Sequence, residues 1–461
     1  MKFAWKENGT DTVESRIQRV QFICLLAVLL ITLVFFLLED RVSGVAYLLV
    51  ERYMTLPAMA FLGVSLCRTM PRSNRRMLYA GLGMIALFFV NQVLHRVLEA
   101  EAKHVGTFVC TYALCLPFAA ATEDDHRQTG LKWMAGLFFA VALLLTVYTG
   151  LLILGMLPGC LQNHVYWDGN RLTAIGHPNI CATLLMIGIA LSAGFAFQSR
   201  KRWIRLLLTV LILLEFGAMS LTNGRTTIIL SCLLLGGIVF CVLRGRGWKR
   251  LLPALLCALL VMAAAFIGSR FLFRWNEERL VANAQMQYES GAADAKQPDD
   301  VLLSDQRQGT LSNDMKTLNG RTTIWRSALA EMADNARLRL IGTEYVDMIL
   351  TRYSFHEIYH THNSWLEALF RMGLPGLAAA LVITGLAVWN IAVVLWRNTD
   401  LWKSCIALMM LCLMGCAVLE PYLFVSDVSY FYLDLLFMMC LGYMNLWRGQ
   451  TLDTGGTAEN V

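Results

Sequence analysis

The stretch Tyr359-His-Thr-His-Asn-Ser-Trp-Leu-Glu-Ala-Leu-Phe-Arg-Met-Gly-Leu-Pro-Gly376 joins the longest polar segment of the chain to an apolar run. That run is long enough to cross a membrane as a helix. Two histidines, His360 and His362, stand at the junction. The stretch therefore places ionisable side chains at the depth of a membrane surface.

A short helix is predicted directly after the histidines. Ser364 and Glu367 match a capping box, S-x-x-E, which predicts that the helix starts just after Asn363. Its apolar residues suit a bilayer interface. Gly373, followed by Pro375-Gly376, predicts the end of this helix and the start of a membrane span.

Apolar runs of similar length recur along the whole chain. The 461 residues are 57% hydrophobic and only 16% charged, whereas a soluble domain is nearer half apolar and a quarter charged. We therefore expect an all-α, polytopic membrane protein with about 12 transmembrane helices. The predicted spans lie near 20–38, 43–66, 77–97, 104–122, 131–157, 173–197, 204–221, 226–243, 251–269, 375–396, 402–420 and 426–447. The first run is full-length and lacks a small-residue cleavage site, so we expect a span there and not a cleavable signal peptide.

Basic residues gather on one side of these spans. They follow the second, sixth and eighth spans, flank the loop after the tenth, and occur beside the N-terminus. The positive-inside rule makes that side cytoplasmic and places both termini there. The net charge of +6 thus indicates topology and contact with anionic lipid, not nucleic-acid binding. The 13 cysteines lie mostly in apolar runs, so no disulfide framework is expected.

The opposite side carries the large polar loop. We expect a membrane bundle over residues 1–269, an extracytoplasmic loop over 270–362, an interfacial helix with C-terminal spans over 363–450, and a polar cytoplasmic tail over 451–461. The middle of the loop, Ala282–Leu318, is polar and predicted to be mobile. Apolar residues at helical spacing predict an amphipathic helix over Thr323–Ala333.

A six-residue string occurs twice, as Asn223-Gly-Arg-Thr-Thr-Ile228 and Asn319-Gly-Arg-Thr-Thr-Ile324. Asn-Gly favours a tight turn, so Arg225 and Arg321 would each stand beside a helix N-terminus, where a phosphate group is favoured. Chance similarity between two ordinary helix starts is the alternative. Both arginines are predicted on the outer side, against the positive-inside trend, which favours a function.

A third arginine precedes the sixth span, in Arg171-Leu-Thr-Ala-Ile-Gly-His-Pro-Asn179. Pro178 suits the first turn of a helix, where its missing N–H is harmless. His177 is either a polar helix-start residue or a ligand contact. Charged residues also occur within predicted spans and are expected to line an outward-facing cleft. They are Glu51, Arg52, Glu215 and Asp434.

The two histidines have three interpretations. His-x-His alone is a weak metal signal, and no cysteine or HExxH pattern supports it, so no metal is expected. An imidazole titrates near neutral pH and suits a general base. The remaining alternative is that His360 and His362 are interfacial residues without a chemical role.

Taken together, these motifs resemble the bacterial O-antigen ligase and polysaccharide polymerase family. The resemblance runs from about Arg171 to Gly376. It is carried by the following pieces: Arg171 with Pro178-Asn179, Leu221-Thr-Asn-Gly-Arg225, Arg321-Thr-Thr-Ile-Trp325, Leu340-Ile-Gly342, His360-Thr-His-Asn363 and Gly373-Leu-Pro-Gly376.

The resemblance implies a glycosyltransferase of the bacterial cytoplasmic membrane with an extracytoplasmic active face. Its donor would be a glycan on a polyprenyl diphosphate, and its acceptor a hydroxyl of a glycan or glycolipid. His362 would be the base, with His360 as the alternate. Arg225, Arg321 and Arg171 would bind the diphosphate, and Asn179 and Arg52 are assigned to the same site. No cofactor is implied. A transporter or flippase of the same lipid-linked glycans is the alternative function.

Overall fold

The computed structural model of the chain describes a defined set of residues. They are residues 23, 27, 30, 57–62, 75–99, 109, 112–116, 127–156, 166–168, 171–173, 178–244, 250–289, 321–350, 360–397, 400–424 and 431–455.

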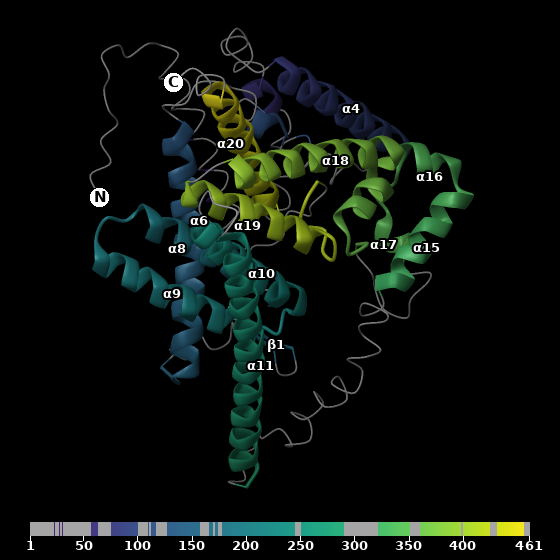
Figure 1. Ribbon diagram of the computed structural model, residues 1–461. Coiled ribbons are helices and arrows are strands. Elements are labelled where there is room, and N and C mark those ends of the chain that lie inside the picture. Colours follow the sequence, from purple (N-terminus) through teal and green to yellow (C-terminus); the bar gives the residue numbers. More distant parts are fainter. Residues whose placement is uncertain are drawn as a thin grey trace. The chain divides into compact units, whose positions relative to one another are not determined.

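Helices make up almost all of the described chain (Figure 1). They are α4 (Arg75–Glu99), α6 (Arg127–Ile153), α8 (Pro178–Gln198), α9 (Arg202–Leu221), α10 (Arg225–Arg244), α11 (Leu251–Glu289), α15 (Arg321–Asp334), α16 (Ala336–Ile341), α17 (Val346–Leu350), α18 (Ser364–Arg397), α19 (Leu401–Ala417) and α20 (Phe431–Gly455). One antiparallel hairpin, β1 (Tyr166–Asp168) with β2 (Arg171–Thr173), was not predicted.

Seven of these helices are long and apolar enough to cross a membrane. They lie in α4, α6, α8, α9, α10, α11 and α18. The apolar helix α19 is shorter, and α20 covers most of the twelfth predicted span. Three predicted spans, 20–38, 43–66 and 104–122, lie mostly outside the described residues. A polytopic helical membrane protein is therefore confirmed, and the count of twelve stays a prediction.

The chain divides into two compact units. One comprises residues 1–134 and 426–446, and the other comprises 135–425 and 447–461. The first unit contains α4, whose buried face includes Leu78, Ile85 and Phe88. The second unit holds every candidate site residue that the structure describes. The boundaries between the four predicted segments stay predictions.

In the second unit, α8 is the central helix. It is apolar all round and nearly every residue from Pro178 to Gly194 is buried, as expected for a helix enclosed by others. Small residues allow close helix approach, as in other membrane proteins. A Cβ at Gly194 would lie 2.4 Å from Trp402 Cε3 on α19, and a Cβ at Gly236 of α10 would lie 2.5 Å from Met262 Cγ on α11.

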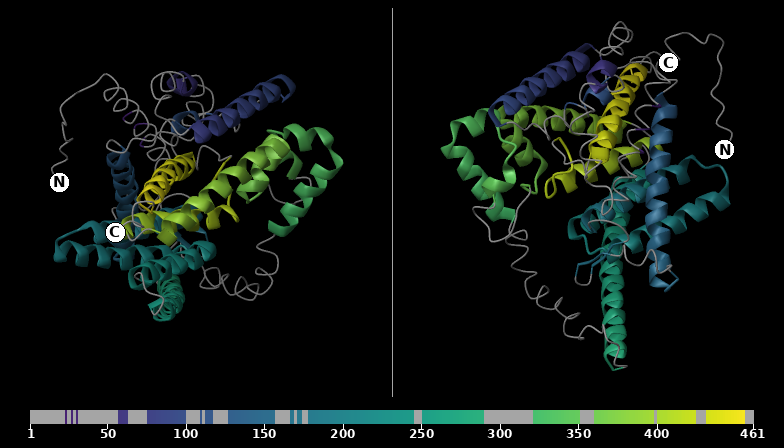
Figure 2. Two further views of the ribbon diagram at one scale, coloured as in Figure 1. Left: turned by 45° about the horizontal axis from the view of Figure 1, so that its top comes forward. Right: turned by 180° about the vertical axis from the view of Figure 1, so that it is seen from behind.

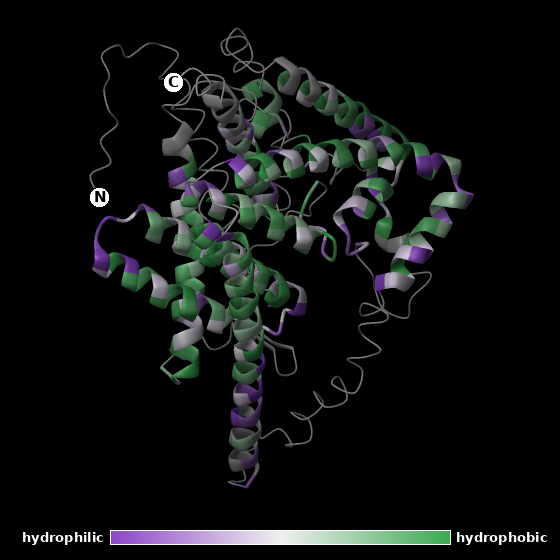
Figure 3. Ribbon diagram, viewed as in Figure 1, coloured by the Kyte–Doolittle hydropathy of each residue, from purple (hydrophilic) through white to green (hydrophobic). Residues whose placement is uncertain are grey.

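The helix α11 is longer than the span predicted within it. It continues without interruption to Glu289, past the expected boundary at residue 269 and into the segment 282–318 that was expected to be mobile. Its first part is hydrophobic, and hydrophilic residues appear toward its C-terminal end (Figure 3). Residues 282–289 are therefore helical, and the mobility of the segment stays a prediction.

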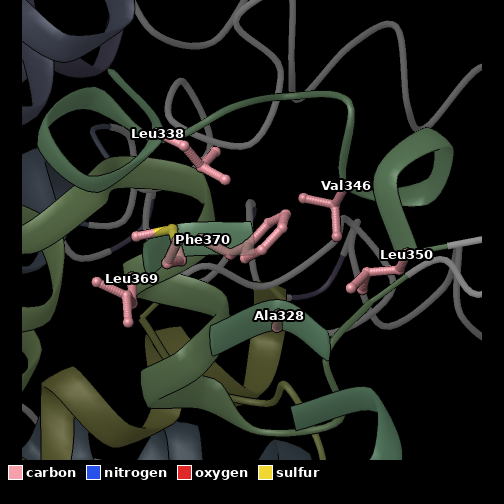
Figure 4. Close-up of a cluster of buried hydrophobic side chains, with 7 residues drawn as sticks. Ala328, Leu338, Val346, Leu350, Leu369 and Phe370 are labelled. Carbon is pink, nitrogen blue, oxygen red and sulfur yellow. The ribbon is translucent and has the colours of Figure 1, made fainter. Parts of the chain in front are cut away.

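Two helices of the predicted loop, α15 and α16, contact α18, and the third, α17, contacts α15. The green helices lie beside the lime helix α18 in both views of Figure 2. The amphipathic helix predicted over Thr323–Ala333 is confirmed as α15. Its buried residues join those of α16, α17 and α18 in one apolar cluster (Figure 4). The cluster comprises Ala328, Met332, Leu338, Val346, Leu350, Leu369 and Phe370.

Two glycines bring the α16 and α18 backbones together. Gly342 and Gly373 both have positive φ, at 82° and 68°. A Cβ at Gly342 would lie 2.3 Å from the Arg371 carbonyl carbon, and one at Gly373 would lie 2.5 Å from that of Leu340. The non-helical conformation of Gly373 breaks α18 where the sequence predicted the interfacial helix to end.

Candidate active site

The loop that carries the histidines ends at Asn363, which caps α18. The Asn363 Oδ1 accepts hydrogen bonds from the backbone N–H groups of Trp365 and Leu366, at 3.0 and 2.9 Å. The predicted helix start after Asn363 is confirmed, but the predicted capping box is wrong. Ser364 and Glu367 bond elsewhere, because a side chain one residue earlier already caps the helix.

Ser364 instead fixes the turn after α19. Its hydroxyl donates to the carbonyl of Glu420 and accepts from the N–H of Leu423, both at 3.0 Å. Asn363 adds a bond from its Nδ2 to the carbonyl of Val418 at 2.9 Å. These contacts hold the start of α18 and the end of α19 together, and they place Glu420 beside the histidine loop.

Glu420 is the residue on which the site converges. Its side chain is largely buried, and its Oε1 accepts from Arg321 Nη2 at 2.5 Å and from Asn179 Nδ2 at 2.7 Å. Its Oε2 lies 3.4 Å from His362 Nδ1. One carboxylate therefore contacts three predicted site residues. They are Asn179 at the start of α8, Arg321 at the start of α15 and His362 in the loop before α18.

The charges around Glu420 favour its ionised form. Burial alone would raise the pKa of this carboxyl. The hydrogen bond with His362 and the positive charge of Arg321 outweigh burial and lower the pKa from its ordinary 4.5 to about 2. A carboxylate that stays ionised can hold the Nδ1 proton of an imidazole, which leaves the Nε2 lone pair free to accept another proton.

The two histidines differ in their surroundings. The His362 side chain is 32% exposed, and its backbone has a φ of 53°, in the left-handed region that non-glycine residues rarely adopt. Its backbone N–H lies 3.3 Å from Nδ1 of His360, and the two rings lie 4.1 Å apart. Burial, and then the neighbouring His362, lower the pKa of His360 to about 4. His360 is thus a weak base.

Arg225 begins α10, and Arg321 begins α15, so both repeats open a helix as predicted. The turn before Arg225 contains Asn223 at a φ of 49°. The next residue, Gly224, approaches α8 so closely that a Cβ there would lie 3.1 Å from Ala182 Cβ. Ala182 lies within the first two turns of α8, as does Asn179, so the Arg225 turn packs against the helix that supplies a ligand of Glu420.

The structure describes some of the other predicted residues but not all of them. Pro178 is the first residue of α8, as predicted. Arg171 begins β2 and pairs in register with Asp168. Arg52 and His177 lie outside the described residues. Of the predicted cleft residues, Glu215 is buried on α9, where its Oε2 accepts from Ser192 at 2.9 Å.

Glu420 was missed by the sequence reasoning. It is the last residue of a predicted apolar span, and Pro421 follows it. A lone carboxyl at the predicted outer end of a span was a usable signal.

Within the described residues, no group of three or more His, Cys, Asp and Glu side chains could hold a metal ion. The expectation of no metal stays a prediction.

Comparison with known proteins adds a family match. Residues 208–381 match the family model described as O-antigen ligase. The matched region runs from α9 into α18 and contains Arg225, Arg321 and both histidines, whereas Asn179 and Glu420 lie outside it. The resemblance inferred from the sequence motifs is thereby confirmed. No curated protein matches the chain.

Proposed function

We propose that this chain, a membrane protein of the O-antigen ligase-related family of glycosyltransferases, moves a glycan from a polyprenyl-diphosphate carrier to a hydroxyl acceptor. The family match and the seven apolar helices support a membrane glycosyltransferase of the ligase or polymerase type. The lipid diphosphate donor, the glycan or glycolipid acceptor and the outer face of the cytoplasmic membrane are the proposed details.

The pair formed by His362 and Glu420 carries the proposal. Glu420 lies 3.4 Å from Nδ1 of His362, and the imidazole is partly exposed, so its Nε2 is available to a bound hydroxyl. A carboxylate that orients an imidazole in this way increases its usefulness as a general base. His360 fits this role less well because its lowered pKa makes it a poorer proton acceptor.

Arg321 connects the base to the proposed phosphate site. One of its Nη atoms bonds Glu420, and a guanidinium group has further N–H donors that a diphosphate can use. Arg225 stands at the start of α10, where the helix N-terminus also favours an anion. Arg171 and Arg52 are proposed to assist on the same ligand.

The proposed reaction is a single displacement. The acceptor hydroxyl gives its proton to His362 Nε2, and its oxygen forms a bond to the anomeric carbon of the donor glycan. The bond between that carbon and the diphosphate oxygen breaks, and the polyprenyl diphosphate leaves with the electron pair. Arg225 and Arg321 stabilise the negative charge that grows on the leaving group. These residues provide a base and an electrostatic clamp without a cofactor.

The arrangement of helix ends supports one shared active face. The starts of α8, α10 and α18 and the ends of α9 and α19 meet around Glu420 and the Arg225 turn. The basic ends lie elsewhere, where Arg244 Nη2 donates to the carbonyl of Leu395 at 2.8 Å. With the positive-inside rule, this separation favours an extracytoplasmic site and cytoplasmic termini.

A transporter or flippase of lipid-linked glycans is the second candidate. One observation favours it: Glu215 is fully buried in the membrane helix α9, and buried intramembrane carboxyls often belong to transport pathways. The clustering of arginine, histidine and glutamate at helix ends, instead of mid-helix, favours the enzyme.

The deciding experiment incubates the purified protein with a glycan on a polyprenyl diphosphate and with candidate glycan acceptors. A ladder of products identifies a polymerase, and one discrete transfer identifies a ligase. The same assay with chelator should keep its activity. Movement of donor across vesicles without any transfer product would overturn the enzyme in favour of the transporter.

A further inference from the structure

A second buried carboxylate, Glu367, holds the histidine loop. Glu367 is 1% exposed, and its Oε2 accepts two hydrogen bonds from Thr361, one from the backbone N–H at 2.7 Å and one from the hydroxyl at 2.8 Å. Thr361 is itself fully buried and lies between His360 and His362 in the sequence. Glu367 therefore binds the histidine loop at Thr361, the residue between His360 and His362.

The other oxygen of Glu367 is bound to Arg371. Arg371 Nε donates to Oε1 at 2.5 Å, and Arg371 Nη1 lies 3.8 Å from Oε2 of Glu344. All three side chains are buried. Burying such charges contributes little net stability compared with apolar packing. Such a network can fix one local geometry, because any rearrangement would leave a buried charged group without its hydrogen bonds, and that costs free energy.

Thr361 also connects the loop to α15. Its carbonyl accepts from Trp325 Nε1 at 2.9 Å, and Trp325 lies one helical turn after Arg321. The residue that follows Thr361 is His362, with its left-handed backbone. A conformation of that kind costs about 1 to 3 kcal/mol and persists only where the surroundings impose it. The hydrogen bonds of Thr361 with Glu367 and with Trp325 fix the residue directly before His362, and they can therefore impose its conformation.

We propose that Glu367 is a positioning residue of the enzyme. By fixing Thr361 it imposes the left-handed backbone of His362, and so directs the imidazole to Glu420 and to the acceptor hydroxyl. Glu367 does this from behind the loop, without itself contacting the donor or the acceptor. The inference rests on the proposed function and adds to it the residue that holds the base in place.

The test compares Glu367→Gln with Glu344→Gln in the transfer assay. Both variants remove one buried carboxylate beside Arg371, but only Glu367→Gln disturbs Thr361, because an amide has a single acceptor oxygen for two sets of donors. We expect Glu367→Gln to lower kcat by about 10- to 100-fold, as a small misplacement of a base does, with the donor KM little changed. Glu344→Gln should lower kcat much less than Glu367→Gln, because it leaves both bonds to Thr361 in place. Equal losses in both variants, or none in Glu367→Gln, would overturn the positioning role.

A second pair keeps the test decisive if Glu367→Gln does not fold. Thr361→Val removes the hydroxyl bond and retains the shape, and Thr361→Ser restores the hydroxyl. We expect kcat to fall about 10-fold in Thr361→Val and to recover in Thr361→Ser. His362→Ala is measured beside them. If it is inactive while the Thr361 and Glu367 variants match the parent, the positioning role fails and the proposed function stands. An active His362→Ala would overturn the proposed base itself.

Discussion

His362 combines a left-handed backbone, a partly exposed ring and a carboxylate partner. If it is the base, His362→Ala should lower glycan transfer by about 100-fold or more, within the range that general base catalysis contributes. The measurement is kcat with purified protein, together with a thermal unfolding curve that shows a folded variant. His360→Ala is the matched control and should lose less. A larger loss in His360→Ala than in His362→Ala would exchange the two roles.

Arg225 and Arg321 are proposed to bind the diphosphate of the donor. Arg225→Ala and Arg321→Ala should raise the donor KM or lower kcat/KM, because a charge-assisted contact contributes about 1.5 to 3 kcal/mol, which is roughly 10- to 100-fold. Lysine at each position should restore part of the loss, since it keeps the charge but not the paired donors. Exposed Arg326, on the same helix as Arg321, supplies the control. Donor kinetics equal to those of the parent in both alanine variants would refute the phosphate role.

Glu420 predicts a specific dependence of stability on pH. Its pKa in the folded protein is about 2, below the ordinary 4.5, so its ionised form stabilises the fold above pH 4.5 and this contribution is lost as the pH falls toward 2. The stability lost in Glu420→Gln should thus be on the order of 3 kcal/mol at pH 7 and should shrink between pH 4.5 and 2. Unfolding of parent and variant in detergent across that range measures it. A difference that stays constant with pH would contradict the assignment.

At the residue scale, local patterns were sufficient for some site residues and not for others. The repeated Asn-Gly-Arg string and the His-x-His pair are visible in short windows of sequence. Glu420 has partners 58 and 241 residues away, at His362 and Asn179, so no window contains them together. The capping box failed for a related reason. Asn363 competes locally for the same N–H groups, and the bonds of Ser364 and Glu367 are settled by tertiary contacts.

At the element scale, the crossing of α16 and α18 depends on two glycines. Gly373→Ala would place a Cβ 2.5 Å from the Leu340 carbonyl carbon in a left-handed conformation. We expect this to destabilise the protein by on the order of 3 kcal/mol. Gly385→Ala, on the same helix with no atom within 4 Å of the added Cβ, should change stability by about 1 kcal/mol or less. Thermal unfolding in detergent compares the two. Equal stabilities would show that the crossing tolerates a side chain.

Elements with strong periodicity were predicted well. The boundaries of α9 and α10 agree with the predicted spans to within two residues, because an apolar run of about 20 residues bounded by charges has few alternatives. The end of α11 was not predicted. Its polar residues after 269 resemble a loop in composition, but nothing in them breaks a helix, and the helix continues to Glu289. The hairpin β1–β2 has strands of three residues, too short to give a periodic signal.

At the scale of the whole molecule, α15 is held in place by side-chain contacts. Arg321 bonds Glu420, Trp325 bonds Thr361, and Ala328 and Met332 join the apolar cluster with α16, α17 and α18. Every one of these partners follows residue 321 in the chain. Glu420 is also bonded by Asn179 of α8, which lies before the segment 290–320. The 31 residues of segment 290–320 could extend over about 100 Å, which imposes little restriction on where α15 lies.

Because its side-chain contacts hold α15 in place, we expect that the peptide chain can be cut within segment 290–320 without displacing this helix. Two polypeptides, one ending and the other beginning within residues 290–320, should assemble when they are co-expressed and should transfer glycan at a rate similar to that of the intact chain. Copurification through a tag on one fragment, followed by the transfer assay, measures this. Fragments that associate but lack activity would show that the linking segment takes part in the reaction. Active fragments would show that the catalytic centre can form by association of two separate polypeptides, one with Asn179 and Arg225 and the other with Arg321, His362 and Glu420.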